Sequence, residues 1–144
     1  CNPASGSFFS KGSNTVTCTA RDRYNNEVTG TFDVVVVDTT PPTVVSSSPT
    51  DGNSGVAVDA VVTFTFSESM MLSSMAPASF FLVAADGTAK AFALSYSAGT
   101  KVATLTPTTN FAGSTVYIAG VTTGARDLAG NRLAAQHVIN FTTA

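Results

Sequence analysis

The chain contains no tryptophan and one histidine, and only 11% of its 144 residues are charged. Its 7 Lys and Arg residues are scattered singly, so they form no basic surface for nucleic acid or an anionic membrane. No apolar run approaches the roughly 20 residues that a membrane-spanning helix needs. Nucleic-acid binding and a transmembrane segment are therefore excluded. The missing tryptophan also weighs against a flat sugar-binding platform, because such platforms are built from exposed aromatic rings.

The sequence offers no convergent catalytic set. His137 has no second histidine or nearby cysteine with which to build a zinc site or a Ser-His-Asp triad. We interpret it as a structural residue that shares a strand face with Ile139 and Phe141. The 9 acidic residues are dispersed, and nothing pairs two of them across a cleft as a glycosidase requires. We therefore expect a protein that is not an enzyme.

The only cysteines are Cys1 and Cys18. A cysteine pair in a Thr- and Ser-rich β protein favours a disulfide over a metal site, and with it an oxidising compartment. A bridge would close a loop of about 17 residues and contribute about 3 kcal/mol by restricting the unfolded chain. The alternative is a lipoprotein with an acylated Cys1, which would tether this residue to a membrane and leave Cys18 alone.

Residues 1–38 predict a partial β unit. Val16, Cys18 and Ala20 alternate with threonines, which is typical of a half-buried strand. A polar, turn-forming stretch, 21–26, precedes a second strand that places Phe32 and Val34 on one face. Because a lone hairpin is marginally stable in water, this segment needs other strands to complete it. The linker 39–42, with its two prolines, then separates it from a second module.

Residues 43–144 are long enough for a complete sandwich. Alternation predicts strands at 43–45, 61–66, 80–83, 92–96, 101–106, 115–121 and 137–142. Between the second and third of these, Ser67–Met75 predicts one or two helical turns with serines at N-cap positions. Asp86-Gly87 predicts a hairpin turn. We expect the cluster of Met70, Met71, Leu72 and Met75 to plug an open end of the sandwich rather than to form an exposed contact patch.

The first module resembles a known family on several short motifs. These are Cys1-Asn2-Pro3-Ala4-Ser5-Gly6-Ser7-Phe8-Phe9, Gly12, Val16-Thr17-Cys18-Thr19-Ala20-Arg21-Asp22, Phe32 and Asp38-Thr39-Thr40-Pro41-Pro42. Together they resemble the C-terminal half of a hyalin-repeat (HYR) domain, an Ig-like sandwich of extracellular proteins. The resemblance implies about three strands here. Gly30 stands where many relatives carry a further cysteine, which leaves Cys1 and Cys18 as the only available pair.

The second module resembles the bacterial Ig-like domains of surface-layer and adhesin-like proteins. The matching residues are Pro41-Pro42-Thr43-Val44-Val45, Ser48-Pro49, Asp51-Gly52, Val61 to Ser67, Glu68, Met70, Ala78-Ser79-Phe80, Leu105-Thr106-Pro107, Asp127-Leu128-Ala129-Gly130-Asn131 and Asn140-Phe141-Thr142-Thr143. Met71-Leu72 stands where relatives more often carry Asp-Pro. The expected fold is thus all-β, an Ig-like antiparallel β-sandwich over 43–144 preceded by the partial unit 1–38.

No cofactor is required by any motif, but calcium is an open alternative. Asp127 and Asn131 flank a loop that offers hard oxygen ligands, and Asp38, next to the linker, would join Asp51 or an upstream loop in an ion site between modules. The competing interpretation of Asp127–Asn131 is a tight turn, because Asp and Asn bond their own backbone and Gly supplies positive φ. The ligand density of an EF-hand loop is absent.

The favoured function is a non-catalytic structural or adhesion module of a secreted or cell-surface bacterial protein. An alternative is a subunit that assembles into a dimer or extracellular filament by β-strand complementation, since the partial unit leaves edges and apolar surface uncovered. Another is an accessory carbohydrate-binding module of a secreted enzyme. Expected partners are neighbouring Ig-like modules, other copies of the chain, or host or matrix surface ligands.

Overall fold

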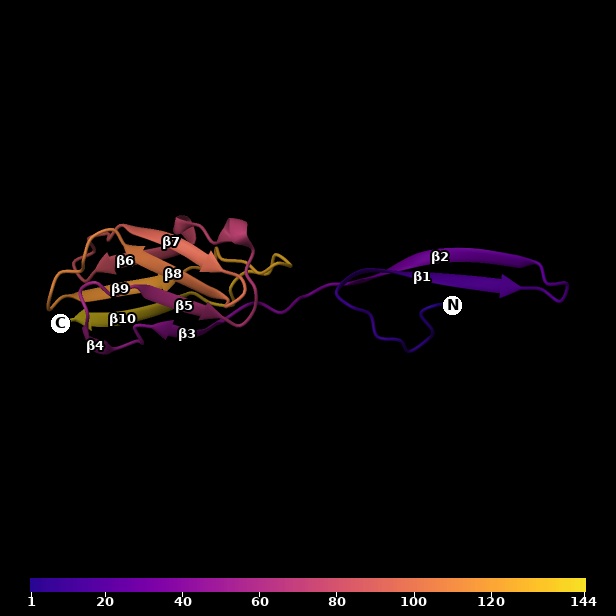
Figure 1. Ribbon diagram of the computed structural model, residues 1–144, viewed down its shortest axis with the longest axis horizontal. Helices are drawn as coiled ribbons and strands as arrows, with labels where there is room; N and C mark the ends of the chain where they lie inside the picture. Colours follow the sequence, from indigo (N-terminus) through magenta and orange to yellow (C-terminus); the bar gives the residue numbers. More distant parts are fainter. The chain divides into compact units, whose positions relative to one another are not determined.

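A computed structural model describes all residues from Cys1 to Ala144. The chain forms two compact units, Cys1–Thr39 and Thr40–Ala144. The first contains strands β1 and β2, and the second contains β3 to β10 (Figure 1). The only helices are two 3-10 turns of 3 residues each, η1 (Leu72–Ser74) and η2 (Pro77–Ser79), and neither has the length to cross a membrane. The prediction of an all-β chain is confirmed.

The first unit is built on one hairpin. β1 (Gly12–Arg21) and β2 (Glu27–Val36) pair in antiparallel register with Val16 opposite Phe32, so the apolar residues share one face, as the alternation predicts. In place of the third strand that was expected here, the structure has a single bridge on the outer side of β1. There the backbones of Asn2 and Thr17 exchange two hydrogen bonds of 2.7 and 2.9 Å.

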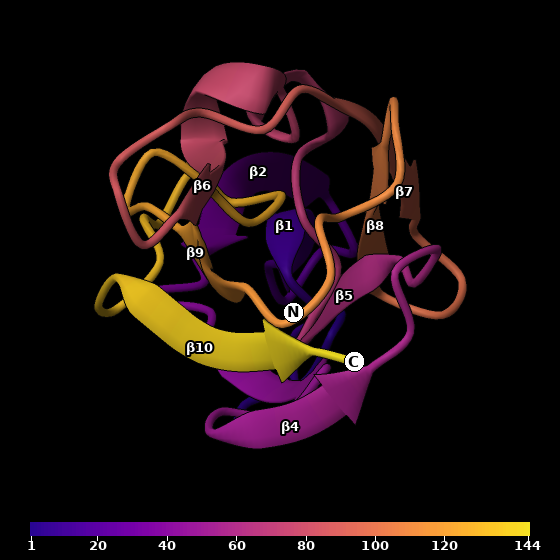
Figure 2. The ribbon, with the colours of Figure 1, turned by 90° about the vertical axis from the view of Figure 1, so that its left-hand side faces the viewer.

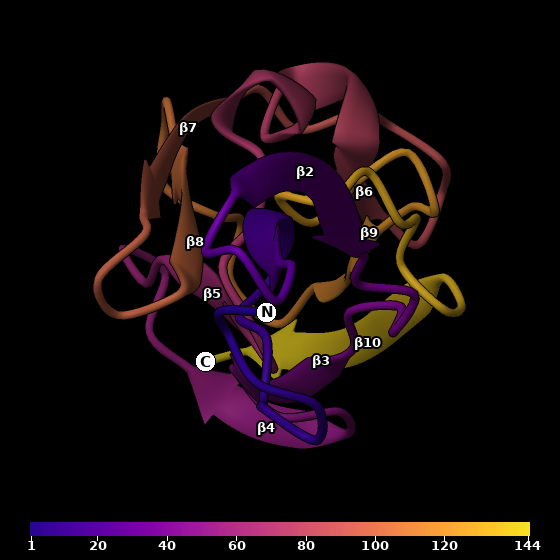
Figure 3. The same ribbon diagram turned by 90° about the vertical axis from the view of Figure 1, so that its right-hand side faces the viewer.

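The second unit contains two four-stranded sheets. In sheet order, one consists of β3 (Val44–Ser48), β5 (Val62–Phe66), β8 (Val102–Pro107) and β7 (Phe92–Ser97). The other consists of β4 (Asn53–Val56), β10 (His137–Thr143), β9 (Val116–Val121) and β6 (Phe80–Ala84). Neighbouring strands are antiparallel except β4 and β10, which are parallel. Seen end-on, β6 and β9 lie opposite β7 and β8 (Figure 2), and the other end shows the same two layers (Figure 3).

The core lies between these layers. Val62, Phe64 and Phe66 alternate along β5 with half-buried threonines, and each of the three is at most 1% exposed. The ring of Phe64 packs 6.3 Å from that of Phe80, which belongs to the opposite sheet. Burying a side chain of this size contributes about 2 kcal/mol. The aromatic face predicted for 61–66 is thus the centre of the sandwich.

The chain segment after β5 closes one end of the sandwich. Met70 and Met75 are buried in the core, as expected for a plug, while Leu72 between them is exposed. The prediction of serine N-caps is wrong, because η1 begins after Met71 and neither 3-10 turn has a side-chain cap. Ser74 binds another loop instead, and its hydroxyl accepts a hydrogen bond of 2.9 Å from the Arg126 backbone.

Two strands differ from those that the sequence predicts. The first strand of the sandwich does not stop at residue 45 but continues through Ser48, because its serines pair with β5. β4 was not predicted, since the segment Asn53–Val56 has one buried residue and no alternation, and it is held by its pairing with β10. Asp86-Gly87 forms the predicted hairpin turn, with Gly87 at φ +85°: Val83 makes an antiparallel bridge with Ala89, and the Ala84 backbone donates to the Thr88 carbonyl over 2.9 Å.

Candidate functional site

The loop predicted to bind calcium forms a closed turn between β9 and β10. The backbone N–H and side-chain Nδ2 of Asn131 donate to the two carboxylate oxygens of Asp127, each over 2.8 Å. The Asp127 backbone N–H in turn donates to the Asn131 carbonyl over 3.0 Å, and Gly130 has the positive φ of +91° that the turn needs. Asp127 is only 1% exposed. The hydrogen bonds are those of the tight-turn interpretation, and calcium binding stays a prediction.

Glu68 also lies at this loop, which the sequence did not predict. One of its carboxylate oxygens lies within 4.8 Å of a carboxylate oxygen of Asp127. The two segments meet because Met70 forms an isolated antiparallel bridge with Asp127, and the Met71 backbone donates to Arg126 over 2.8 Å. The Asp127 carboxylate accepts its hydrogen bonds from Asn131, and Glu68 adds a second carboxylate beside it. A hard divalent cation is the class of ligand that this oxygen pair would suit.

The third predicted calcium ligand, Asp38, belongs to the first unit. Its carboxylate forms an ion pair with Lys11 there. Asp51, its expected companion, accepts a hydrogen bond of 2.8 Å from the Asn140 backbone and thereby ties the turn before β4 to β10. Both carboxylates therefore already make structural contacts within their own units.

His137 lies at the start of β10, on the inner side of its sheet. Its ring meets Phe64 edge-on at 5.9 Å, and its Nε2 is a buried side-chain polar atom with no hydrogen-bond partner. This packing is what the structural interpretation predicts, and that interpretation stays a prediction. The neighbouring strand approaches closely, since a Cβ on Gly120 would come within 2.6 Å of the His137 carbonyl oxygen.

The tyrosines do not build an aromatic platform within the sandwich. Tyr117 is buried against Phe111 at 4.5 Å, and its hydroxyl accepts a hydrogen bond of 2.9 Å from the Ala112 backbone. Tyr96 is half-buried, and its hydroxyl accepts a bond of 2.8 Å from Met70. Tyr24 is exposed but belongs to the first unit. The carbohydrate-binding alternative thus gains no support from these side chains.

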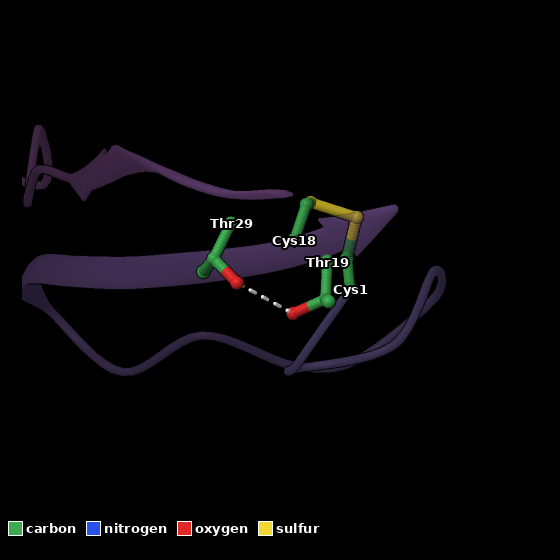
Figure 4. Close-up of a disulfide and its surroundings, with 4 residues drawn as sticks. All are labelled: Cys1, Cys18, Thr19 and Thr29. Atoms are coloured by element: carbon green, nitrogen blue, oxygen red, sulfur yellow. Dashed lines mark hydrogen bonds between the residues drawn. A yellow bond between two sulfur atoms is a disulfide. The ribbon is translucent and has the colours of Figure 1, made fainter. Parts of the chain in front are cut away.

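The first unit is cross-linked by one disulfide. Cys1 and Cys18 are bonded, and no cysteine in the structure is free (Figure 4). Next to the bridge, the hydroxyls of Thr19 and Thr29 lie 3.1 Å apart across the hairpin (Figure 4). On the apolar face beside it is a shallow hollow of about 620 Å³, whose lining includes Cys18, Gly30 and Phe32.

Comparison with known families and proteins places both units. The chain matches the bacterial Ig-like domain model over residues 38–143 and the HYR domain model over residues 1–36. A comparison with curated proteins found no match. Both resemblances seen in the sequence are confirmed, in the predicted order.

Several solved structures share the fold. A structure of the surface layer protein SbsC, domains 1-6, is 20% identical with a TM-score of 0.55, and the match covers 72% of this chain but only 14% of that one. PcoC, a methionine-rich copper resistance protein from Escherichia coli, is 17% identical with a TM-score of 0.59, covering 73% and 100%. The LD transpeptidase LdtMt1, in complex with imipenem, is 19% identical with a TM-score of 0.53, covering 73% and 41%. Since the family model spans most of the chain, the chain belongs to the bacterial Ig-like domain family.

Proposed function

We propose that this chain is a non-catalytic structural or adhesion module of an extracellular or cell-surface multi-module protein. The observation that carries the proposal is the pairing of β4 with β10, the parallel pair in the sandwich. β4 follows β3 near the start of this unit, and β10 lies at its end. Once β3 has separated from β5, force applied to the two ends of the unit therefore acts along β4 and β10 in opposite directions. The pair is then loaded in shear, and its hydrogen bonds resist together rather than one at a time.

Several contacts reinforce this pair. The Gly52 backbone donates to the Asn140 carbonyl over 2.8 Å, and the Ala144 backbone donates to the Val56 carbonyl over 2.9 Å. Asp51 adds its side-chain bond to the Asn140 backbone. β10 is also paired along its other edge with β9 over 6 residue pairs. The last strand is therefore held on both sides, which suits a module that transmits tension.

The buried polar groups support a structural rather than a catalytic role. Ser79, Asp127 and Thr143 are the buried polar residues, and each bonds a loop. The Ser79 hydroxyl donates to the Ser74 carbonyl over 2.8 Å, and the Thr143 hydroxyl donates to the Ala112 carbonyl over 2.6 Å. None of the three lies against His137 in a nucleophile-base pair. The disulfide and the family membership support an extracellular setting.

A single-molecule force experiment tests the proposal by changing the direction of pulling. β6 and β10 run the same way, because each is antiparallel to β9, so the turn at Asp86 and the C-terminus lie at the same end of the sandwich. Handles at Pro41→Cys and the C-terminus load β4 and β10 in shear. Handles at Asp86→Cys and the C-terminus peel strands apart. We expect a clearly higher unfolding force in the first geometry, and equal forces would remove the mechanical argument.

A further inference from the structure

The only arginines of the sandwich, Arg126 and Arg132, stand at the two ends of the turn at Asp127. They form an isolated antiparallel bridge. On either side of this bridge, the backbone N–H of the residue after each arginine donates to the carbonyl of the residue before the other, over 3.0 and 2.9 Å. The arginines are therefore a non-hydrogen-bonded pair, in which the Cα atoms lie about 4.5 Å apart and the side chains are close together.

No acidic side chain pairs with either arginine. The ion pairs Lys11–Asp38 and Arg21–Glu27 belong to the first unit, and the Arg132 guanidinium makes no hydrogen bond within the chain. The carboxylate of Asp127 is bound by Asn131, and it lies on the other face of the turn because neighbouring residues of a ladder alternate. Like charges directly opposite each other are destabilising. The bridge thus holds two positive charges side by side with no carboxylate between them.

The first unit shows the same position with a counterion. Its turn over residues 22–26 has the same three hydrogen bonds as the turn at Asp127. Arg21 and Glu27 flank that turn, lie directly opposite each other and form an ion pair, in which Arg21 Nε donates to the carboxylate over 2.8 Å. Arg126 corresponds to Arg21. A second cation therefore occupies the position in the sandwich that a carboxylate holds in the first unit.

Arg126 is held in place before any ligand binds. Its backbone N–H donates to the Ser74 hydroxyl over 2.9 Å, and its carbonyl accepts a bond of 2.8 Å from the Met71 backbone. Its half-buried side chain donates through Nη1 to the Gly130 carbonyl over 3.0 Å. A Cβ added to Gly130 would find nothing within 4 Å, so the space beside this contact is open. Only the exposed Arg132 side chain has to be ordered on binding, which lowers the entropic cost.

We infer that Arg126 and Arg132 together bind a tetrahedral oxyanion with two negative charges, such as a terminal phosphate group. The anion takes the place that the Glu27 carboxylate has in the first unit. Planar guanidinium groups bind phosphate and carboxylate oxygens in bidentate geometry. Two adjacent positive charges match a dianion better than they match the single charge of a carboxylate or a phosphodiester. The inference goes beyond the proposed mechanical role, since it assigns a ligand class to one turn.

An NMR titration of the 144-residue chain with sulfate tests binding directly. The Nε–Hε signals of Arg126 and Arg132 should shift together and saturate. Arg23 is the internal control, because it is an exposed arginine of the first unit that also has no ion pair. Its signal should change little when the ionic strength is kept constant. A shift at Arg23 as large as those of the pair would show general screening and overturn the site.

A comparison of four anions at equal ionic strength tests the ligand class. Inorganic phosphate should bind as sulfate does, because both are tetrahedral and carry nearly two charges at neutral pH. Acetate and dimethyl phosphate carry one charge each and represent a carboxylate and a phosphodiester. They should bind at least about threefold more weakly, since the attraction scales with ligand charge. Equal or tighter binding of either would overturn the assignment of a dianion.

Substitutions at the exposed Arg132 test the geometry. Arg132→Glu recreates the pair of the first unit, so the new carboxylate should occupy Arg126 and weaken sulfate binding by about tenfold or more. Arg23→Glu makes the same change in net charge and should leave binding within about twofold. Arg132→Lys keeps the charge but loses the planar donor group, and its loss should be intermediate. Unchanged binding in Arg132→Glu would overturn the inference.

Thermal unfolding gives a readout that does not depend on the arginine signals. At low salt without added anion, Arg132→Glu should unfold at a higher temperature than the wild type, because an opposite-charge pair replaces a like-charge pair. Millimolar sulfate should raise the unfolding temperature of the wild type and not that of Arg132→Glu. If the two proteins unfold at the same temperature with and without sulfate, the two arginines do not form the site.

Discussion

The two units use the same sequence pattern with opposite results. In β2 and in β5, a phenylalanine stands in the middle of an alternating apolar face, yet Phe32 is 55% exposed and Phe64 is 0% exposed. The difference lies in what faces the strand. β5 has neighbours on both sides within its sheet and a second sheet above it, whereas β2 has a single neighbour. Alternation thus specifies which face is apolar, and the second layer decides whether that face is buried.

The units also share one turn. Asp22 and Asn26 in the first unit form the same three hydrogen bonds as Asp127 and Asn131 in the second, with distances between 2.8 and 3.0 Å. The turn before β2 is exposed, while Asp127 is almost fully buried. Comparing the stability of the two turns therefore shows how much burial strengthens the same three hydrogen bonds.

The largest expected effect is the difference in stability loss between substituting Phe64 and substituting Phe32. Phe64→Ala should destabilise the sandwich by about 3–5 kcal/mol, because it removes buried surface and leaves a cavity between the sheets. Phe32→Ala should change the stability of the hairpin by no more than about 0.5 kcal/mol, since the ring is largely solvated already. Chemical denaturation, monitored by amide hydrogen exchange in each unit, gives the stability change caused by each substitution. Similar losses at the two sites would contradict the comparison.

The next effect tests how the first unit holds together without a second layer. A small unit with little core depends on covalent restraint. Replacing Cys1 and Cys18 together by serine should cost this unit about 3 kcal/mol and expose the β1 amides to exchange. The amides of β5 and β8 should stay protected, because the sandwich contains no cysteine. Loss of protection in both units would mean that they do not fold independently.

The repeated turn allows a matched pair of substitutions. Asp127→Ala should destabilise the sandwich by about 2 kcal/mol, because the buried donors of Asn131 lose their acceptor. Asp22→Ala should cost its exposed hairpin much less, because water replaces the carboxylate. Thermal unfolding and amide exchange supply the two values. Equal costs would mean that burial does not set the strength of this turn.

Calcium binding would be a further difference between the buried turn at Asp127 and the exposed turn at Asp22. If the pair formed by Glu68 and Asp127 binds the ion, millimolar calcium should raise the unfolding temperature of the sandwich, and Glu68→Gln should abolish that rise. Magnesium is tested in parallel, because it keeps most of its water and is bound through one or two carboxylates, so an equal rise with both ions would mean that the site does not select calcium. An unchanged unfolding temperature in calcium would reject the metal prediction and leave Asp127 as a turn residue.

The sequence predicts most strands because their apolar residues alternate and their turns are marked. β5 is the clearest case, with Val62, Phe64 and Phe66 inward. β4 could not be predicted in this way, because Asn53–Val56 contains one buried residue and is strand only through its pairing with residues almost ninety positions later. A strand that depends on a distant partner leaves no local pattern.

The candidate calcium site also has one part that the sequence predicts and one part that it does not. The turn from Asp127 to Asn131 was predictable, because each residue type favours that geometry locally. The approach of Glu68 to Asp127 was not, since it results from the bridge between Met70 and Asp127 across 57 positions of sequence. Contacts between loops at one end of a sandwich follow from topology, and no spacing within the sequence encodes them.

The smallest expected effect concerns the exposed turn. Hydrogen bonds from the side chain and backbone of Asn26 lower the pKa of Asp22 below its ordinary value of 3.8. A carboxyl with a lowered folded-state pKa stabilises the folded state above the unfolded pKa, and this contribution is lost as the pH falls through the folded value. Acid should therefore loosen this turn only at pH values below about 4.

An NMR titration of the Asp22 carboxyl checks this. Asn26→Ala should raise the pKa of Asp22 toward 3.8, because it removes the side-chain donor that contributes most to the shift. Asp86 is the internal control, since its pKa is lowered by the backbone of Thr88 and should not respond to the substitution. If Asp22 titrates at the same pH in both proteins, its hydrogen bonds with Asn26 are not maintained in solution, and the hairpin turn is looser than its buried counterpart in geometry as well as in energy.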